Sequence, residues 1–345
     1  MTDDLQGREP ETKDAVVVAG IDCGTNSIRL KVSRVDQKGS HDLLPRMLRV
    51  IRLGQGVDQT HSFSPQALDR AFAAAGEFAR VLRQYPVEGM RFVATSASRD
   101  AENRQEFEDG MESILGVRPE VITGTEEAAL SFLGACSSLP QDSLRAPYLV
   151  VDLGGGSTEF VLGGDGVESP ADQVREALSM NIGSVRMTER HLLDAPPTDE
   201  QIQEAVADIN RHIDQAFKRI QVGRTGSIIG VSGTVTTMAA LALGLTQYDH
   251  AAVDGARISI QDALAVDERV LRSSRTQLRS CKTIHPGRVD VAAGGALVWS
   301  RILVRLAQAV TETQGRNLDS FISSEHGLLD GLVLDYGRKL LAKRS

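Results

Sequence analysis

The feature that most constrains the fold is one loop that occurs twice in the chain. Residues 22–27 (DCGTNS) align with residues 152–157 (DLGGGS), and each segment lies between two apolar runs. We call these segments the first and the second glycine loop. Because an aspartate, a glycine turn and a hydroxyl residue recur at matching positions, the repeat predicts a duplicated domain with one equivalent loop on each copy.

The pattern around the loops predicts strands that alternate with helices. Apolar or alternating runs predict eight strands, at residues 15–21, 28–35, 48–53, 91–95, 147–153, 158–162, 227–231 and 320–322. Helical spacing predicts six helices, at residues 65–83, 125–135, 199–217, 235–243, 289–309 and 325–341. Alternation of this kind in both halves predicts an α/β fold.

Composition narrows the class of protein. The chain has 345 residues, of which 41% are hydrophobic and 24% are charged, as in globular proteins of about two domains. No apolar run reaches the roughly 18 residues of a membrane span. The formal net charge of -8 disfavours nucleic acid and anionic membranes as partners. The three scattered cysteines favour a reducing, cytoplasmic location.

The chain also suggests its own boundaries. Residues 1–14 are polar and charged, so we expect a disordered N-terminus there and no signal peptide. The repeat then places a first domain at residues 15–139 and a second at residues 140–324. Residues 140–146 are the expected linker.

The second glycine loop has the composition of an anion cradle. Gly154, Gly155 and Gly156 permit a tight turn in which backbone N–H groups converge on one anion. Ser157 and Thr158 add hydroxyl donors. A glycine-rich hairpin turn without a ligand is the alternative for one loop taken alone. The second copy of the loop argues for phosphate binding.

The first glycine loop supplies the second cradle. Its Gly24 allows the turn, and Thr25, Asn26 and Ser27 are the expected donors to phosphate. Neither loop has the GxxxxGK[ST] spacing of a P-loop, and the GxGxxG fingerprint of dinucleotide-binding proteins is absent. Nicotinamide chemistry therefore has little support.

Three carboxylates lie close to the loops in sequence. Asp22 and Asp152 end the strands that lead into the loops, and Glu159 follows the second loop. Mg²⁺ favours one or two carboxylates together with phosphate oxygens from a substrate. The sequence therefore predicts Mg²⁺ at these residues, with Mn²⁺ as the alternative.

Six segments, in order along the chain, resemble the exopolyphosphatase/guanosine pentaphosphatase (Ppx/GppA) family: residues 20–30, 52–57, 94–103, 124–128, 151–159 and 323–331. The two loops also resemble the phosphate loops of the actin/Hsp70/sugar-kinase superfamily. The resemblance implies two actin-like (ribonuclease H-like) domains with the active site in the interdomain cleft. It also implies that the final helix, within residues 325–345, packs on the first domain, and that the protein forms a homodimer.

The resemblance suggests which residues carry the chemistry. Glu127 matches the family's catalytic glutamate, which would activate water, and Glu126 is the alternative base. Both acids could instead stabilise the positive end of a helix. Arg99 follows a strand, and its guanidinium is suited to phosphate oxygens, although it could simply pair with Asp100.

Two further segments are candidates for substrate binding. Ser232, Gly233 and Thr234 end a strand and begin a helix, where N–H groups can bind an anion. An ordinary helix start is the alternative. Arg288 precedes the long apolar helix and resembles an arginine of the family, with a role in substrate binding or in structure.

The resemblance leaves several functions open. We expect Mg²⁺-assisted release of terminal phosphate from inorganic polyphosphate, of short or intermediate length because the chain lacks the additional C-terminal helical region of long family members. Hydrolysis of pppGpp is the first alternative. A non-catalytic sensor of a phosphorylated nucleotide and an ATP-dependent kinase are the others.

Overall fold

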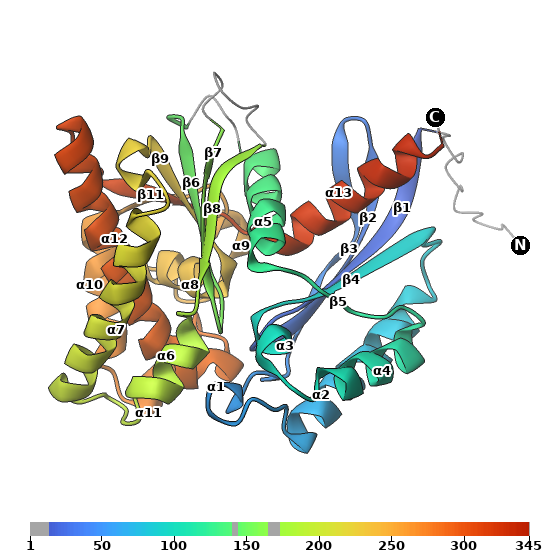
Figure 1. The fold of residues 1–345 in the computed structure, drawn as a ribbon, viewed down its shortest axis with the longest axis horizontal. Coiled ribbons are helices and arrows are strands. Elements are labelled where there is room, and N and C mark those ends of the chain that lie inside the picture. The colour runs from blue at the N-terminus through green and yellow to red at the C-terminus, as the bar shows by residue number, and fades with distance from the viewer. Residues whose placement is uncertain (1–13, 140–143, 165–172, 345) are drawn as a thin grey trace, which may run out of the picture.

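The computed structural model describes residues 14–139, 144–164 and 173–344. The chain forms two mixed sheets with helices packed on them, so the predicted α/β class is confirmed (Figure 1). The predicted disordered N-terminus lies almost entirely outside the described residues, as does most of the predicted linker. No helix in the described part of the chain has the length and apolar character needed to cross a membrane.

The first sheet has five strands in the order β3-β2-β1-β4-β5. Strands β1 and β2 form an antiparallel hairpin joined by the first glycine loop, and β4 lies parallel to β1 on its other side. The strand bounds are β1 (Ala15–Cys23), β2 (Ser27–Asp36), β3 (Gly39–Val50), β4 (Gly89–Ala94) and β5 (Glu120–Val121).

The second sheet repeats this arrangement in the order β10-β11-β9-β6-β7-β8. Strands β6 and β7 form the hairpin joined by the second glycine loop, and β9 lies parallel to β6. Asp22 pairs with Arg29 across the first hairpin, and Asp152 pairs with Glu159 at the same position of the second. The strand bounds are β6 (Tyr148–Leu153), β7 (Thr158–Gly163), β8 (Val174–Met180), β9 (Ser227–Val231), β10 (Arg257–Ser259) and β11 (Ser320–Ser323).

The helices begin where the sequence offers capping residues. The side chains of Ser64, Thr123 and Thr198 accept N-cap hydrogen bonds at the starts of α2, α5 and α7. The bounds are α1 (Val57–Thr60), α2 (Pro65–Leu82), α3 (Ser96–Asp100), α4 (Arg104–Leu115), α5 (Gly124–Ser138), α6 (Ser184–His191), α7 (Asp199–Phe217), η2 (Val222–Arg224), α8 (Ser232–Ala242), α9 (His250–Val253), α10 (Ile260–Leu271), α11 (Arg275–Ser280), η3 (Pro286–Val291), α12 (Ala292–Gln314) and α13 (Leu328–Ala342).

Each sheet is buried by its own set of helices. In the first half, Ile21 and Leu30 of the hairpin share a core with Phe78 of α2. In the second half, the fully buried Trp299 of α12 packs edge-to-face on Phe321 of β11, with ring centroids 5.0 Å apart. These cores fix the hairpins, and the glycine loops lie at the hairpin tips.

Two helices, α5 and α13, cross between the sheets with their backbones in contact (Figure 1). A Cβ on Gly134 of α5 would lie 2.0 Å from the carbonyl oxygen of Gly327, and one on Gly331 of α13 would lie 1.9 Å from that of Leu130. Only glycine permits this approach. Helix α13 then packs on β1 and β2 of the first sheet. The domain boundaries drawn from the sequence stay predictions.

Candidate active site

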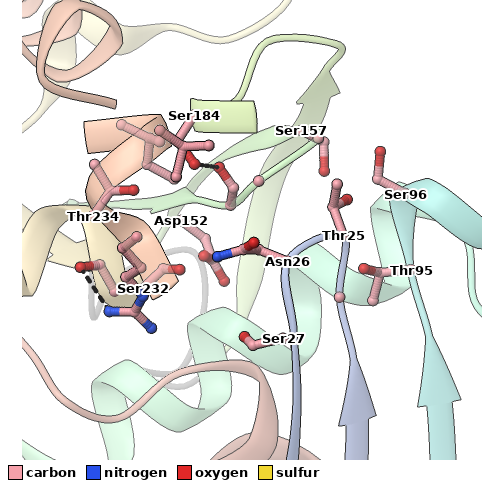
Figure 2. A pocket seen from close by; sticks show the side chains of 18 of the residues that line it. Thr25, Asn26, Ser27, Thr95, Ser96, Asp152, Ser157, Ser184, Ser232 and Thr234 are labelled. Atoms are coloured by element: carbon pink, nitrogen blue, oxygen red, sulfur yellow. Dashed lines mark hydrogen bonds between the residues drawn. The ribbon is translucent and has the colours of Figure 1, made fainter. Parts of the chain in front are cut away.

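The two glycine loops face each other across a cleft (Figure 2). The N–H of Gly24 donates to the carbonyl of Ser27 at 3.0 Å, and the N–H of Gly154 donates to that of Ser157 at the same distance. The repeat therefore folds into two loops that share this closing hydrogen bond and line one cleft. Asn26 of the first loop lies beside Asp152 in Figure 2.

The loops approach each other so closely that a side chain would not fit between them. A Cβ on Gly156 would lie 2.6 Å from the hydroxyl oxygens of both Thr25 and Ser96. A Cβ on Gly155 would lie 3.0 Å from Cβ of Thr25. Contact between the loops thus requires glycine at Gly155 and Gly156, whatever backbone conformation the turn itself needs.

Three carboxylates in the cleft wall are buried together. Burial raises the pKa of Asp22 to about 6, and the charge of Asp152 adds to the rise. Burial also raises the pKa of Asp152, against a hydrogen bond from the Ser131 hydroxyl. Burial raises the pKa of Glu127 to about 7, although Arg99 opposes the shift. These three carboxylates share one small region, which favours the arrival of a cation.

Glu127 is held at the start of α5 by a contact from α3. Nη1 of Arg99 donates to Oε2 of Glu127 at 2.8 Å and to the backbone carbonyl of Ile122 at 3.0 Å. Arg99 does not line the cleft itself. Glu126 points elsewhere and forms an ion pair with Arg91 at 2.6 Å. The geometry therefore places Glu127, rather than Glu126, at the cleft.

Two predicted residues lie behind the cleft wall. The Thr158 hydroxyl is fully buried and donates to the carbonyl of Ile182 at 2.7 Å. Glu159 is also buried and accepts a hydrogen bond from Ser179 at 2.7 Å. Burial, followed by the charge of Glu127, raises the pKa of Glu159 well above its usual range. The structure does not bring Thr158 or Glu159 to the cleft.

The donor set in the cleft suits Mg²⁺ bound together with a substrate. No group of three or more histidine, cysteine or acidic side chains forms a ready metal centre within the described residues. Asp22 and Asp152, in contrast, both line the cleft, and the charge of Asp152 raises the pKa of Asp22. Because Mg²⁺ usually retains water and uses only one or two protein carboxylates, this pair fits such an ion.

The start of α8 also reaches the cleft. Ser232, Gly233 and Thr234 all line it, as predicted for residues that could contact an anion. Ser232 has a φ of 77°, which is uncommon for a residue with a side chain. Nη1 of Arg288 donates to the carbonyl of Gly233 at 3.1 Å. Arg288 lines both the cleft and a second hollow beside it.

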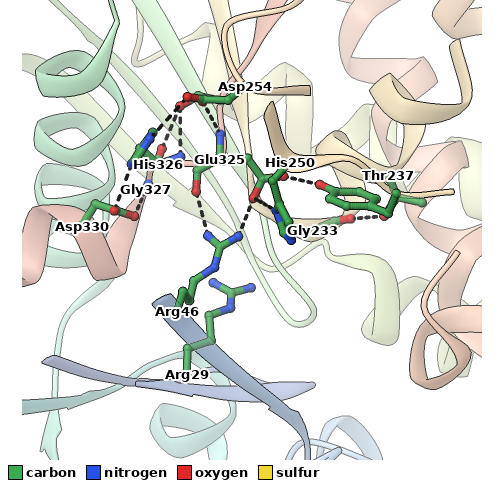
Figure 3. Close-up of polar contacts among 12 residues, drawn as sticks. Arg29, Arg46, Gly233, Thr237, His250, Asp254, Glu325, His326, Gly327 and Asp330 are labelled. Carbon is green, nitrogen blue, oxygen red and sulfur yellow. Dashed lines mark hydrogen bonds and ion pairs between the residues drawn. The ribbon is translucent and has the colours of Figure 1, made fainter. Parts of the chain in front are cut away.

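This second hollow, which we call the basic pocket, shares Arg29, Asp152 and Arg288 with the cleft and has a volume of about 380 Å³. Figure 3 shows the polar contacts of several residues that line it, among them Arg29, Arg46 and Glu325. Burial, followed by the charge of Arg29, lowers the pKa of Arg288 to about 10, so its guanidinium is still charged at neutral pH. Arg46 donates to the backbone carbonyl of Glu325 at 2.7 Å and pairs with the carboxylate of the same residue. The basic residues that line the pocket are Arg29, Arg46, His250, Lys282, His285 and Arg288, and the acidic ones are Asp152, Glu325 and Asp330.

Arg29 and Arg46 were not predicted from the sequence as site residues. Both lie on the first hairpin and its neighbouring strand, with Arg29 paired to Asp22 at 3.2 Å. Arg29 stands at the position of the first hairpin that Glu159 occupies in the second, so the internal repeat could have marked it. Arg46 and Glu325 are 279 residues apart, and no local pattern links them.

A model of the Ppx/GppA phosphatase family matches residues 32–334. The chain belongs to this family. Exopolyphosphatase 2 of Mycobacterium tuberculosis is 41% identical over 325 residues, which cover 92% of this chain and 97% of that protein. As a member of the Ppx/GppA family, the chain is a phosphohydrolase, as its sequence predicts.

Solved structures of Ppx/GppA proteins share the fold. An exopolyphosphatase-like protein with 65% sequence identity superposes with a TM-score of 0.94, covering 95% of this chain and 99% of its own. The Aquifex aeolicus family member, 25% identical, superposes with a TM-score of 0.72 over 94% of this chain and 99% of its own. The predicted actin-like, two-domain fold is therefore confirmed.

Proposed function

We propose that this Ppx/GppA phosphatase is an exopolyphosphatase, which releases the terminal phosphate of inorganic polyphosphate. The observation that carries the proposal is the continuity of the cleft with the basic pocket, because a phosphate chain needs an anion site at the reacting end and cations along its length. The name of the Mycobacterium tuberculosis relative, Exopolyphosphatase 2, supports it.

The reacting end would lie between the glycine loops, beside Glu127. Hydrolysis of a phosphoanhydride requires an oriented water molecule, a clamp on the transferred group and neutralisation of its charge. A carboxylate whose pKa is about 7 is well matched to accept a proton from water at neutral pH. Arg99 would hold this carboxylate in place, and the loop N–H groups would hold the phosphoryl oxygens.

Mg²⁺ would be held by Asp22 and Asp152 and would supply neutralising charge to the phosphate oxygens. Both carboxylates line the cleft, whereas Glu159, the third predicted ligand, lies behind it. We expect binding of the ion to lower the pKa of both aspartates, because a nearby positive charge favours the ionised form.

The rest of the chain would occupy the basic pocket. Arg288 has no carboxylate ion-pair partner in the described part of the chain, so a phosphate group would give this buried cation its counter-charge. The pocket is limited in volume and leads directly from the reacting end. A polyphosphate of short or intermediate length is therefore the proposed substrate.

The test is an assay of orthophosphate release from polyphosphates of defined length, with pppGpp and ATP as competing substrates, in the presence and absence of Mg²⁺. We expect release from polyphosphate to require the metal and to be lost with EDTA. Arg288→Gln should raise KM for chains that reach the basic pocket more than for pyrophosphate. Efficient release from pppGpp but not from polyphosphate would contradict the proposal.

Hydrolysis of pppGpp is the second candidate, and one observation favours it. Tyr248 and His250 pack edge-to-face at the wall of the basic pocket, with ring centroids 5.0 Å apart, and aromatic rings can stack on a nucleobase. The Tyr248 hydroxyl, however, is already bound to Glu325. The same assay separates the two substrates.

We also infer a cytoplasmic location and a homodimer. All three cysteines are free, which suits a reducing compartment. The homodimer rests on the family resemblance alone, and sedimentation of the purified protein would test it. A monomer at micromolar concentration would contradict this assignment.

A further inference from the structure

The second glycine loop is held from behind by the first residues of α6. Three successive loop carbonyls each accept a hydrogen bond from this segment: Gly154 from the N–H of Ser184 at 3.0 Å, Gly155 from the N–H of Val185 at 2.8 Å, and Gly156 from Nε of Arg186 at 2.7 Å. Neither Val185 nor Arg186 was identified from the sequence. Their contacts define the orientation of the whole loop.

The orientation of the carbonyls sets the orientation of the N–H groups. In a trans peptide the N–H points opposite to the C=O of the same plane. The N–H groups of residues 155–157 therefore point away from the donors in α6, and these three residues line the cleft. Within the described part of the chain, no hydrogen-bond acceptor is found for these three N–H groups. A set of unpaired N–H groups in one turn is an anion-binding arrangement.

Arg186 also reaches the opposite half of the protein. Its side chain is buried, and its guanidinium pairs with Asp58 of α1 and with Asp100 of α3, the latter at 2.5 Å. Nη2 lies 3.4 Å from the hydroxyl of Ser96. Helices α1 and α3 belong to the half that carries the first glycine loop. One guanidinium thus holds both the second loop and the wall opposite it.

We propose that Arg186 is a positioning residue that couples closure of the cleft to the orientation of the second glycine loop. Asp58 and Asp100 fix the guanidinium so that its Nε points at the Gly156 carbonyl. Loss of these acids would free the guanidinium, and the Gly156 carbonyl would lose its donor. That peptide could then rotate and place an oxygen, instead of the Ser157 N–H, toward the phosphate. The proposal rests on phosphate binding by this loop.

The chain offers a matched control in Arg190. Its Nη2 pairs with the same Asp58 at 2.8 Å and its Nη1 with Asp208 at 2.8 Å, but it has no hydrogen bond to the glycine loop. Arg190→Gln therefore removes a charge from the same ion-pair network and leaves the loop carbonyls bound. Arg186→Gln removes the donor to the loop together with the charge.

The experiment measures kcat and KM on a short polyphosphate, and separately the affinity for pyrophosphate by calorimetry. Removing one donor to a transition-state oxygen typically costs about 100-fold in kcat, so we expect a loss of about that size in Arg186→Gln, with pyrophosphate affinity also reduced. Arg190→Gln should stay within about threefold of the unaltered protein. Added guanidinium ion at millimolar concentration should partly restore an Arg186→Ala variant.

Equal losses in Arg186→Gln and Arg190→Gln, or a folded Arg186→Gln with unchanged kcat, would overturn the proposal. If Arg186→Gln does not fold, Asp100→Asn replaces it, with a smaller loss of kcat expected at unchanged melting temperature. The pyrophosphate measurement separates this proposal from the proposed function. Normal pyrophosphate affinity in Arg186→Gln would reject the positioning role. If the unaltered protein binds pyrophosphate but does not hydrolyse polyphosphate, only the proposed substrate is rejected.

Discussion

Among single residues, we propose Glu127 as the general base because three features meet at its carboxylate. It lies in the first turn of α5 next to the cleft, it is nearly fully buried, and it accepts a hydrogen bond from Arg99 at 2.8 Å. Burial raises its pKa to about 7, and Arg99 limits the rise. The family resemblance already favoured Glu127 over Glu126. The contact of Glu126 with Arg91, away from the cleft, agrees with that choice.

The pKa of Glu127 predicts the pH dependence of the reaction. A general base acts in its deprotonated form, so kcat/KM should rise with pH below about 7 and level off above it. Arg99→Gln removes a charge that lowers this pKa, so the rise should move to higher pH. Rate measurements from acid to alkaline pH test this. If Arg99→Gln leaves the pH profile of kcat/KM unchanged, the group that titrates belongs to the substrate and not to Glu127.

A buried carboxylate far from the cleft in sequence, Asp267 of α10, predicts an effect on the free energy of unfolding. Neither of its oxygens has a hydrogen-bond partner within the described residues, and burial raises its pKa well above the usual range. The unfolded chain releases this proton at lower pH than the folded chain. The contribution of this carboxyl to the free energy of unfolding is therefore most favourable at low pH. It falls as pH rises toward the folded pKa, by about 1.4 kcal/mol for each pH unit between the two values.

Asp267→Asn removes this titration while keeping the size of the side chain. We expect the variant to gain stability relative to the unaltered protein, and to gain more at pH 8 than at pH 5. Urea unfolding at the two values of pH measures the difference. An equal change at both values would show that the folded chain does not hold the proton of Asp267.

At the level of secondary structure, the predictions from the sequence were most accurate where apolar runs and turn residues indicated the same element. Both hairpins that carry the glycine loops were predicted, because apolar runs and turn residues agree there. Strand β8 was missed, since most of its residues are only half-buried and its polar side chains hide the alternation. The predicted strand at 48–53 is wrong in extent, because β3 runs from Gly39 to Val50 along the edge of its sheet and there tolerates Pro45.

Tertiary contacts account for the helix ends that the sequence misplaced. Helix α12 begins at Ala292 rather than at residue 289, since the preceding residues form the 3-10 helix η3. Helix α13 begins at Leu328 rather than at residue 325, because Glu325 is held by Arg46 and Tyr248. Periodicity marks which residues suit a helix but contains no information on partners from distant segments.

The crossing of α5 and α13 gives a prediction at this level. Gly331→Ala would drive a methyl group into the backbone of α5, so we expect a loss of about 1–3 kcal/mol in the free energy of unfolding. Gly76→Ala in α2 is the control, because no atom lies within 4 Å of its Cβ position and alanine favours a helix by about 1 kcal/mol. Urea unfolding of both variants is the measurement. Gain of stability in Gly331→Ala would contradict the crossing.

Across the whole molecule, two similar halves are joined so that their loops lie opposite each other. The internal repeat predicted the loops, and the cleft contains most of the residues proposed from it. What the sequence did not provide is the set of contacts across the halves, such as Arg186 with Asp100 or Arg46 with Glu325. These pairs join segments far apart in the chain, and single-sequence patterns describe only near neighbours.

The most direct measurement for the whole account is a crystal structure of the Glu127→Gln variant with Mg²⁺ and a short polyphosphate. Glutamine retains the size of Glu127 and can still accept from Arg99, so the cleft should stay intact while turnover stops. We predict the terminal phosphoryl group between residues 24–27 and 154–157, hydrogen-bonded to both loops, with the chain leading toward Arg288. A polyphosphate bound elsewhere, with the space between the loops filled by water, would contradict the account.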